Sequence, residues 1–81
     1  MNTEKLTIMQ EKPDINRLKV VLVERKRTNR WLAEQLGKDE ATVSKWCTNT
    51  IQPTLETLWK IANILDVDVR DLLISSHNRY T

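Results

Sequence analysis

Two short helical patterns joined at a single glycine constrain this chain more than any other feature. They lie within residues 29–55, which read NRWLAEQLGKDEATVSKWCTNTIQPTL. The first pattern ends at Gly37, and the second begins after Asp39 and includes Val43 and Trp46. Two helices with a short glycine-containing turn are typical of a helix-turn-helix, a motif that places its second helix in a DNA groove.

Length and cysteine content restrict the class of protein. A chain of 81 residues is expected to form one domain with a compact core. The lone Cys47 has no partner for an intrachain disulfide and no second thiol for a zinc site, which agrees with a reducing compartment. No apolar run approaches the roughly 18 residues of a membrane span, and the N-terminus lacks the apolar centre of a signal peptide. We expect a soluble cytoplasmic protein without a membrane or metal partner.

The charges are polarised along the chain although the net charge is only +2. Residues 17–30 carry six basic side chains against one acidic side chain, and residues 54–74 carry four acidic against two basic. A phosphate-facing surface would be built from the first segment, with the second directed away from DNA. A merely solvated face explains the same charges equally well.

Helical periodicity divides the chain into three parts. Residues 1–13 show no such periodicity and end at Pro13, so we expect a flexible arm there. Residues 14–74 are expected to form the domain, and residues 75–81 a frayed tail. The first helix is expected at about residues 15–27 with Asp14 as its N-cap. Its apolar stripe comprises Ile15, Leu18, Val21 and Leu22.

Polar caps and a left-handed turn predict the boundaries of the next two helices. Thr28 precedes a helix at residues 29–36, and Gly37 is its natural left-handed C-cap. Because the chain contains no other glycine, we expect this turn alone to require positive φ strictly. The third helix begins after Asp39 and ends at Asn49, a residue type that tolerates left-handed geometry.

The C-terminal third predicts two further helices. Thr54 caps the clearest amphipathic pattern in the chain, formed by Leu55, Leu58, Ile61, Ala62 and Leu65. Asp68 then caps a short helix that contains Val69, Leu72 and Leu73. The sequence therefore predicts an all-α fold, a compact five-helix domain with a helix-turn-helix formed by its second and third helices.

These residues resemble the lambda-repressor-like helix-turn-helix family, the Cro and phage-repressor or XRE type. The resemblance covers about Asn16 to Leu73. It rests on matching offsets of Leu32-Ala33, Leu36-Gly37, Thr42-Val43-Ser44-Lys45-Trp46, Pro53-Thr54-Leu55-Glu56-Thr57-Leu58, Ile61-Ala62 and Leu65.

The resemblance implies a DNA interface on the second and third helices. The helix at about Glu40–Cys47 would enter the major groove, and the helix before it would cross the backbone. The positions matching base contacts are Glu40, Ala41, Thr42, Ser44 and Lys45. The positions assigned to the DNA backbone are Thr28, Asn29, Arg30, Lys38, Thr48, Asn49 and Thr50.

The sequence departs from the family pattern in two ways. The family often pairs an arginine in the first helix with a glutamate at the end of the third, and Leu22 and Cys47 stand there instead. Replacing both charges by apolar groups is often neutral or stabilising, so we predict that Leu22 packs near Cys47. Glu40 brings acidic charge toward DNA, and it would accept from a cytosine amino group, pair with Lys38, or repel phosphate. Lys45 is the stronger candidate for reading guanine.

The tryptophans and Cys47 have simpler alternatives to a binding role. Trp46 is expected in the core, whereas Trp31 and Trp59 mark either an interface or a lid over a small core. A buried thiol is a better interpretation of Cys47 than a redox sensor. The expected dimer interface comprises Trp59, Leu73 and Ile74.

The leading hypothesis is a sequence-specific DNA-binding regulator of bacterial or phage type, acting as a homodimer on double-stranded DNA. The alternative is a protein-interaction module, an antitoxin or a bridging cofactor, with weak DNA binding. An enzyme is not expected, because one His77 in the tail and one Cys47 supply no oriented nucleophile and base. No cofactor is expected.

Overall fold

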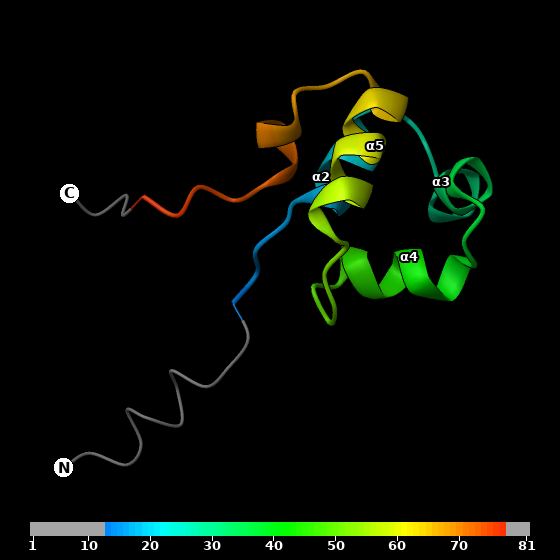
Figure 1. The fold of residues 1–81 in the computed structure, drawn as a ribbon, viewed down its shortest axis with the longest axis horizontal. Helices are drawn as coiled ribbons and strands as arrows, with labels where there is room; N and C mark the ends of the chain where they lie inside the picture. Colours follow the sequence, from blue (N-terminus) through cyan, green and yellow to red (C-terminus); the bar gives the residue numbers. More distant parts are fainter. Residues whose placement is uncertain (1–12, 78–81) are drawn as a thin grey trace, which may run out of the picture.

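The computed structural model describes residues 13–77, so the arm and tail predicted at the two termini lie largely outside the described residues. It confirms the all-α fold (Figure 1). Within residues 13–77, four α-helices precede a 3-10 helix: α2 Leu18–Glu24, α3 Asn29–Leu36, α4 Glu40–Cys47, α5 Leu55–Leu65 and η1 Val69–Leu72. The expected fifth helix is thus a single 3-10 turn.

One hydrophobic core joins these elements. Helix α3 packs against α4 and α5, while α2 contacts both α4 and η1. The largest completely buried side chains come from every element: Leu18, Val21, Leu22, Leu32, Val43, Ile61 and Leu72. The helix-turn-helix is therefore held from behind by α2 and α5.

All four predicted N-caps from Thr28 onward are confirmed. Thr28 Oγ1 accepts from the Trp31 N–H at the start of α3, and Asp39 Oδ1 accepts from the Thr42 N–H at the start of α4. Thr54 and Asp68 act in the same way for α5 and η1. Each cap satisfies a backbone donor that the first helical turn leaves without a partner.

Every α-helix of the described chain is followed, within two residues of its end, by a residue with positive φ, which corrects the expectation that Gly37 alone requires it. The four residues are Lys26, Gly37, Asn49 and Asp66. The residue after each of these four donates its backbone N–H to the carbonyl five positions earlier. The hydrogen bonds are Arg27 N to Leu22 O, Lys38 N to Ala33 O, Thr50 N to Lys45 O, and Val67 N to Ala62 O. These are Schellman ends, which satisfy carbonyl groups left free by the last turn.

The first helix is shorter than predicted, and Asp14 is not its cap. Helix α2 begins at Leu18, and the Leu18 N–H donates to Asn16 Oδ1 instead. Residues 15 and 16 are held extended, because Ile74 N donates to Ile15 O and Asn16 forms an isolated antiparallel bridge with Leu73. Ile15, expected in the apolar stripe, is therefore 46% exposed.

Leu55, like Ile15, was expected in the core but is exposed. It begins α5 and is 75% exposed, because none of the described elements covers that face of the first turn. The other members of the α5 pattern are buried, namely Leu58, Ile61, Ala62 and Leu65. Trp46 is buried as predicted, and Leu73 lies outside η1 and is exposed.

Candidate nucleic-acid interface

Helix α4 has one anchored face and one exposed face. Val43 is completely buried and Trp46 is 4% exposed, so these two side chains fix the helix to the core. Glu40, Ala41, Ser44 and Lys45 are all exposed. At about 100° per residue, positions 40, 41, 44 and 45 fall within an arc of about 140° around the helix, so these four side chains form one broad outward strip.

Thr42 contributes to the cap of α4 as well as to its surface. It is half-buried, and its hydroxyl donates to Asp39 Oδ1, the same atom that accepts from the Thr42 N–H. The side-chain and backbone hydrogen bonds from Thr42 lower the pKa of Asp39 below its ordinary value. Thr42 is thus committed to the helix start, which makes it a weaker candidate for base contact than its neighbours.

One of the three roles considered for Glu40 has no support in the described residues. No ion pair joins Glu40 and Lys38 there, whereas Arg30 pairs with Glu34 at 3.7 Å one helix earlier. Glu40 therefore stands as an uncompensated carboxylate at the exposed start of α4. The remaining roles are acceptance from a base and repulsion of phosphate.

The start of α3 combines a capped backbone with a tethered side chain. Thr28 Oγ1 lies 3.0 Å from the backbone nitrogen of Trp31 and accepts its hydrogen bond. The backbone N–H groups of Asn29 and Arg30 have no acceptor among residues 13–77. Asn29 Oδ1 accepts from the Cys47 thiol, with 3.3 Å between oxygen and sulfur. The start of α3 and the end of α4 therefore lie side by side.

The structure places Leu22 and Cys47 on two helices that contact one another. Leu22 is buried, and Cys47 is half-buried at the edge of the same core. Burial raises the pKa of the Cys47 thiol, and the positive charge of Lys19 on α2 lowers it by a smaller amount. The direct contact between Leu22 and Cys47 stays a prediction, and the polar partner of the thiol is Asn29.

Beyond α4, two threonines face outward and the asparagine between them faces inward. The hydroxyls of Thr48 and Thr50 lie 2.7 Å apart, and both residues are exposed. Asn49 is 8% exposed, and its amide bonds to the backbone of Ile15 and Asn16. The expected phosphate contact of the Asn49 side chain does not fit this geometry, because its polar atoms are already used within the protein.

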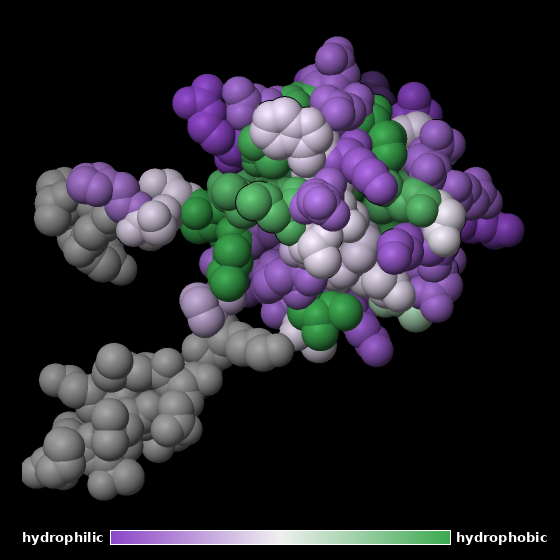
Figure 2. All heavy atoms as spheres, in the orientation of Figure 1, coloured by the Kyte–Doolittle hydropathy of each residue, from purple (hydrophilic) through white to green (hydrophobic). Residues whose placement is uncertain are grey.

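The residues expected at a dimer interface are exposed, and they are part of a wider apolar surface. Trp59 is 61% exposed, and Leu73 and Ile74 are 38% and 39% exposed. Figure 2 shows hydrophobic side chains gathered on the face from which the C-terminal segment leaves the domain. A shallow hollow on this side is lined by residues that include Ile15, Leu55 and Leu73. Sequence reasoning missed Ile15 and Leu55 because their spacing matches that of core positions.

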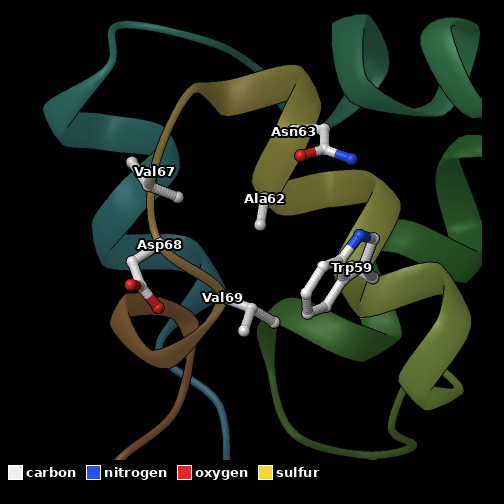
Figure 3. Close-up of a pocket in the computed structure, with 6 residues that line it drawn as sticks. All are labelled: Trp59, Ala62, Asn63, Val67, Asp68 and Val69. Carbon is white, nitrogen blue, oxygen red and sulfur yellow. The ribbon is translucent and has the colours of Figure 1, made fainter.

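A second hollow lies between α5 and η1. Figure 3 shows the indole of Trp59 beside Val69, with Ala62 above them on α5. Its volume is about 190 Å³. Small-molecule sites usually have a volume of about 300 Å³ or more, so this hollow is smaller than a typical ligand site. Among residues 13–77, no cluster of three or more His, Cys, Asp or Glu side chains could hold a metal ion. No helix in that range is long and apolar enough to cross a membrane.

Comparison with known proteins agrees with this geometry. A family model described as helix-turn-helix matches residues 18–72. A crystal structure described as that of a candidate DNA-binding protein from Bacteroides fragilis is 58% identical, with a TM-score of 0.73. The match covers 74% of this chain and 97% of that one. None of the curated proteins matches the chain.

Proposed function

Because the chain belongs to the helix-turn-helix family of the XRE or Cro type, we propose that it is a sequence-specific, non-enzymatic transcriptional regulator of bacterial or phage type. The observation that carries this proposal is the division of α4 into two faces. Val43 and Trp46 hold the helix rigidly, while Ala41, Ser44 and Lys45 stay exposed. A short helix presented in this way fits the major groove of DNA.

The exposed strip of α4 contains side chains that suit base recognition. Lys45 can donate to O6 or N7 of guanine, and the methyl group of Ala41 can contact a thymine methyl. Ser44 can donate or accept, so it suits several bases. Glu40 can accept only from a donor such as the cytosine amino group, and otherwise repels phosphate.

Backbone contacts would come from both ends of the motif. At the start of α3, the N–H groups of Asn29 and Arg30, with the Asn29 amide, suit a phosphate. After α4, the exposed residues Thr48 and Thr50 would also contact the DNA backbone. Lys38, in the turn between α3 and α4, would add positive charge at the opposite end of α4.

A homodimer would give this small domain enough contact with DNA. One module of this size buries too little surface for strong specific affinity, and two half-sites about 34 Å apart are the usual solution. The apolar surface around Leu55, Trp59, Leu73 and Ile74 is the proposed contact between the two copies. It uses α5 and the C-terminal segment, so α4 is left free for DNA.

Selection of bound duplexes from a random pool tests the proposal most directly. We expect the wild-type protein to enrich a two-fold symmetric motif, and Lys45→Ala to lose preference at one position of each half-site. Val20→Ala, on an exposed position of α2, serves as the control and should keep the motif. If the wild-type protein enriches no motif, the regulator hypothesis is wrong.

A second candidate function is a protein-interaction module, such as an antitoxin or a bridging cofactor, with weak DNA binding. The observation that favours it is the exposure of Leu55 and Trp59 one turn apart on α5. Salt dependence separates the two functions, because phosphate contacts make affinity fall steeply with ionic strength. Binding to a protein partner through an apolar surface would change little over the same range.

A further inference from the structure

The thiol of Cys47 connects the end of α4 to the start of α3. Its sulfur lies 3.3 Å from Asn29 Oδ1, to which the S–H group donates. Cys47 is the last residue of α4, and Asn29 is the first residue of α3. A side-chain hydrogen bond therefore joins the two helices of the motif at the point where the proposed function requires a phosphate contact.

We infer that Cys47 is a positioning residue, which orients the Asn29 amide so that Nδ2 donates to a DNA phosphate. This inference rests on the proposed function, because it describes how one contact of that interface is set. An amide side chain has an acceptor end and a donor end that point apart. When the thiol holds Oδ1, the donor end is directed away from Cys47.

The donor end of Asn29 is available for a ligand. Among residues 13–77, Nδ2 donates to no protein acceptor, and no buried side-chain nitrogen or oxygen lacks a partner. Nδ2 therefore reaches solvent, because a buried Nδ2 in this half-buried residue would be an unsatisfied donor. Beside it, the N–H groups of Asn29 and Arg30 are also without acceptors in that range. These donors and the positive end of the α3 dipole favour an anion.

The thiol is suited to act as the donor in this pair. Burial raises the pKa of Cys47 from an ordinary value of 9.0, so the sulfur keeps its proton at neutral pH. The positive charge of Lys19 opposes this rise of the Cys47 pKa without reversing it. A thiolate would instead repel both Oδ1 and an approaching phosphate.

Without the thiol, the Asn29 amide loses the group that distinguishes its two ends. It can then turn Oδ1 outward, and an outward carbonyl oxygen repels phosphate. Loss of the thiol should therefore weaken DNA binding through Asn29 and through no other contact. This dependence separates positioning from a general contribution of Cys47 to folding.

A double-mutant cycle on one duplex tests this dependence. Because phosphate contacts do not require a particular sequence, a generic 20-base-pair duplex at low salt is a sufficient probe. The variants are Asn29→Ala, Cys47→Ala, their combination, and Cys47→Ser, which keeps a donor of similar size. Fluorescence anisotropy gives each Kd, and thermal unfolding shows that each variant is folded at the assay temperature.

We expect Asn29→Ala to weaken binding about tenfold and Cys47→Ala about threefold, in line with the loss of one hydrogen bond to a charged group. The double variant should match Asn29→Ala, and Cys47→Ser should stay within about twofold of wild type. In NMR spectra, the Asn29 side-chain amide signals should shift on DNA addition in the wild type and in Cys47→Ser, and by a smaller amount in Cys47→Ala.

Three outcomes overturn the inference, and they distinguish its failure from the failure of the proposed function. If Asn29→Ala weakens binding while Cys47→Ala does not, or if Cys47→Ala weakens it equally in the Asn29→Ala background, the positioning role is wrong and DNA binding stands. If the wild-type protein binds no duplex even at low salt, the proposed function is wrong and the inference falls with it.

Discussion

Asn49 and Asn16 form a buried clamp between the end of α4 and the segment that precedes α2. Asn49 Oδ1 accepts from the Asn16 N–H at 2.9 Å, and Asn49 Nδ2 donates to the Asn16 carbonyl at 3.0 Å. Asn16 in turn donates to the Trp46 carbonyl at 2.9 Å. The pair therefore satisfies backbone groups that would otherwise be buried without partners, and it fixes where α4 ends.

Removing the Asn49 side chain should destabilise the fold strongly. Asn49→Ala leaves buried backbone groups of residues 15 and 16 unpaired, which costs about 3 kcal/mol of unfolding free energy. Asn49 also has a φ of 59°, so Ala adds backbone strain that Asn49→Gly avoids. In urea unfolding, the wild type should be the most stable, Asn49→Gly less stable, and Asn49→Ala the least stable. Equal stability of wild type and Asn49→Gly would contradict the clamp.

The residues with left-handed backbone angles after α2 and α3 predict opposite effects of substitution on stability. Gly37 has a φ of 67° and open space where a Cβ would lie, so Gly37→Ala should cost about 1 kcal/mol through strain alone. Lys26 has a φ of 58° without being a glycine, so Lys26→Gly should gain about 0.5 kcal/mol. Lys26→Ala, which removes the charge but keeps the Cβ, is the control and should not gain stability. Urea unfolding midpoints measure all three changes.

Local chemistry could be predicted from the sequence, whereas contacts between distant segments could not. The caps at Thr28, Asp39 and Thr54 depend on an oxygen and an N–H three residues apart, and all three were predicted correctly. The Asn16 and Asn49 clamp joins residues 33 apart, and no local pattern indicates it. The family resemblance places Asn49 at the DNA backbone, although its side chain is turned inward.

The same limit explains the exposed apolar residues. Helical spacing places Leu55 on the stripe of α5, but burial of the first turn requires a neighbouring element, and none of the described ones lies there. Within the candidate interface, the alternation of buried Val43 and Trp46 with exposed Ser44 and Lys45 was predictable because it follows the helical repeat. The bond between Cys47 and Asn29 was not, because it depends on how two helices meet.

The cap of α4 should make stability depend on pH in the acidic range. Hydrogen bonds from Thr42 hold the pKa of Asp39 below its ordinary value of 3.8. A carboxylate with a lowered pKa stabilises the fold above the unfolded-state pKa, and this contribution is lost as pH falls through the folded-state pKa. Asp39→Asn keeps a capping oxygen but cannot titrate, so its stability should fall less between pH 5 and pH 2. Urea unfolding at several pH values compares the two proteins.

The exposed apolar surface predicts that one residue of α5 controls self-association. Trp59 is 61% exposed on the proposed dimer face, so Trp59→Glu should leave folding intact and convert dimer to monomer in sedimentation equilibrium. Val23 on α2 is 62% exposed and lies outside that face, so Val23→Glu is a matched control that should stay dimeric. A wild-type protein that remains monomeric at high concentration would contradict the dimer.

Glu40 should limit DNA affinity through its charge. It stands exposed in the first turn of α4, and no ion pair with a described residue neutralises it. Glu40→Gln removes one negative charge from the helix end that approaches DNA, so binding to a generic duplex at low salt should strengthen about threefold. Glu56→Gln, an acidic residue in the first turn of α5, is the matched control and should change affinity little. If Glu40→Gln instead weakens binding only to duplexes with a cytosine at one position, Glu40 reads that base.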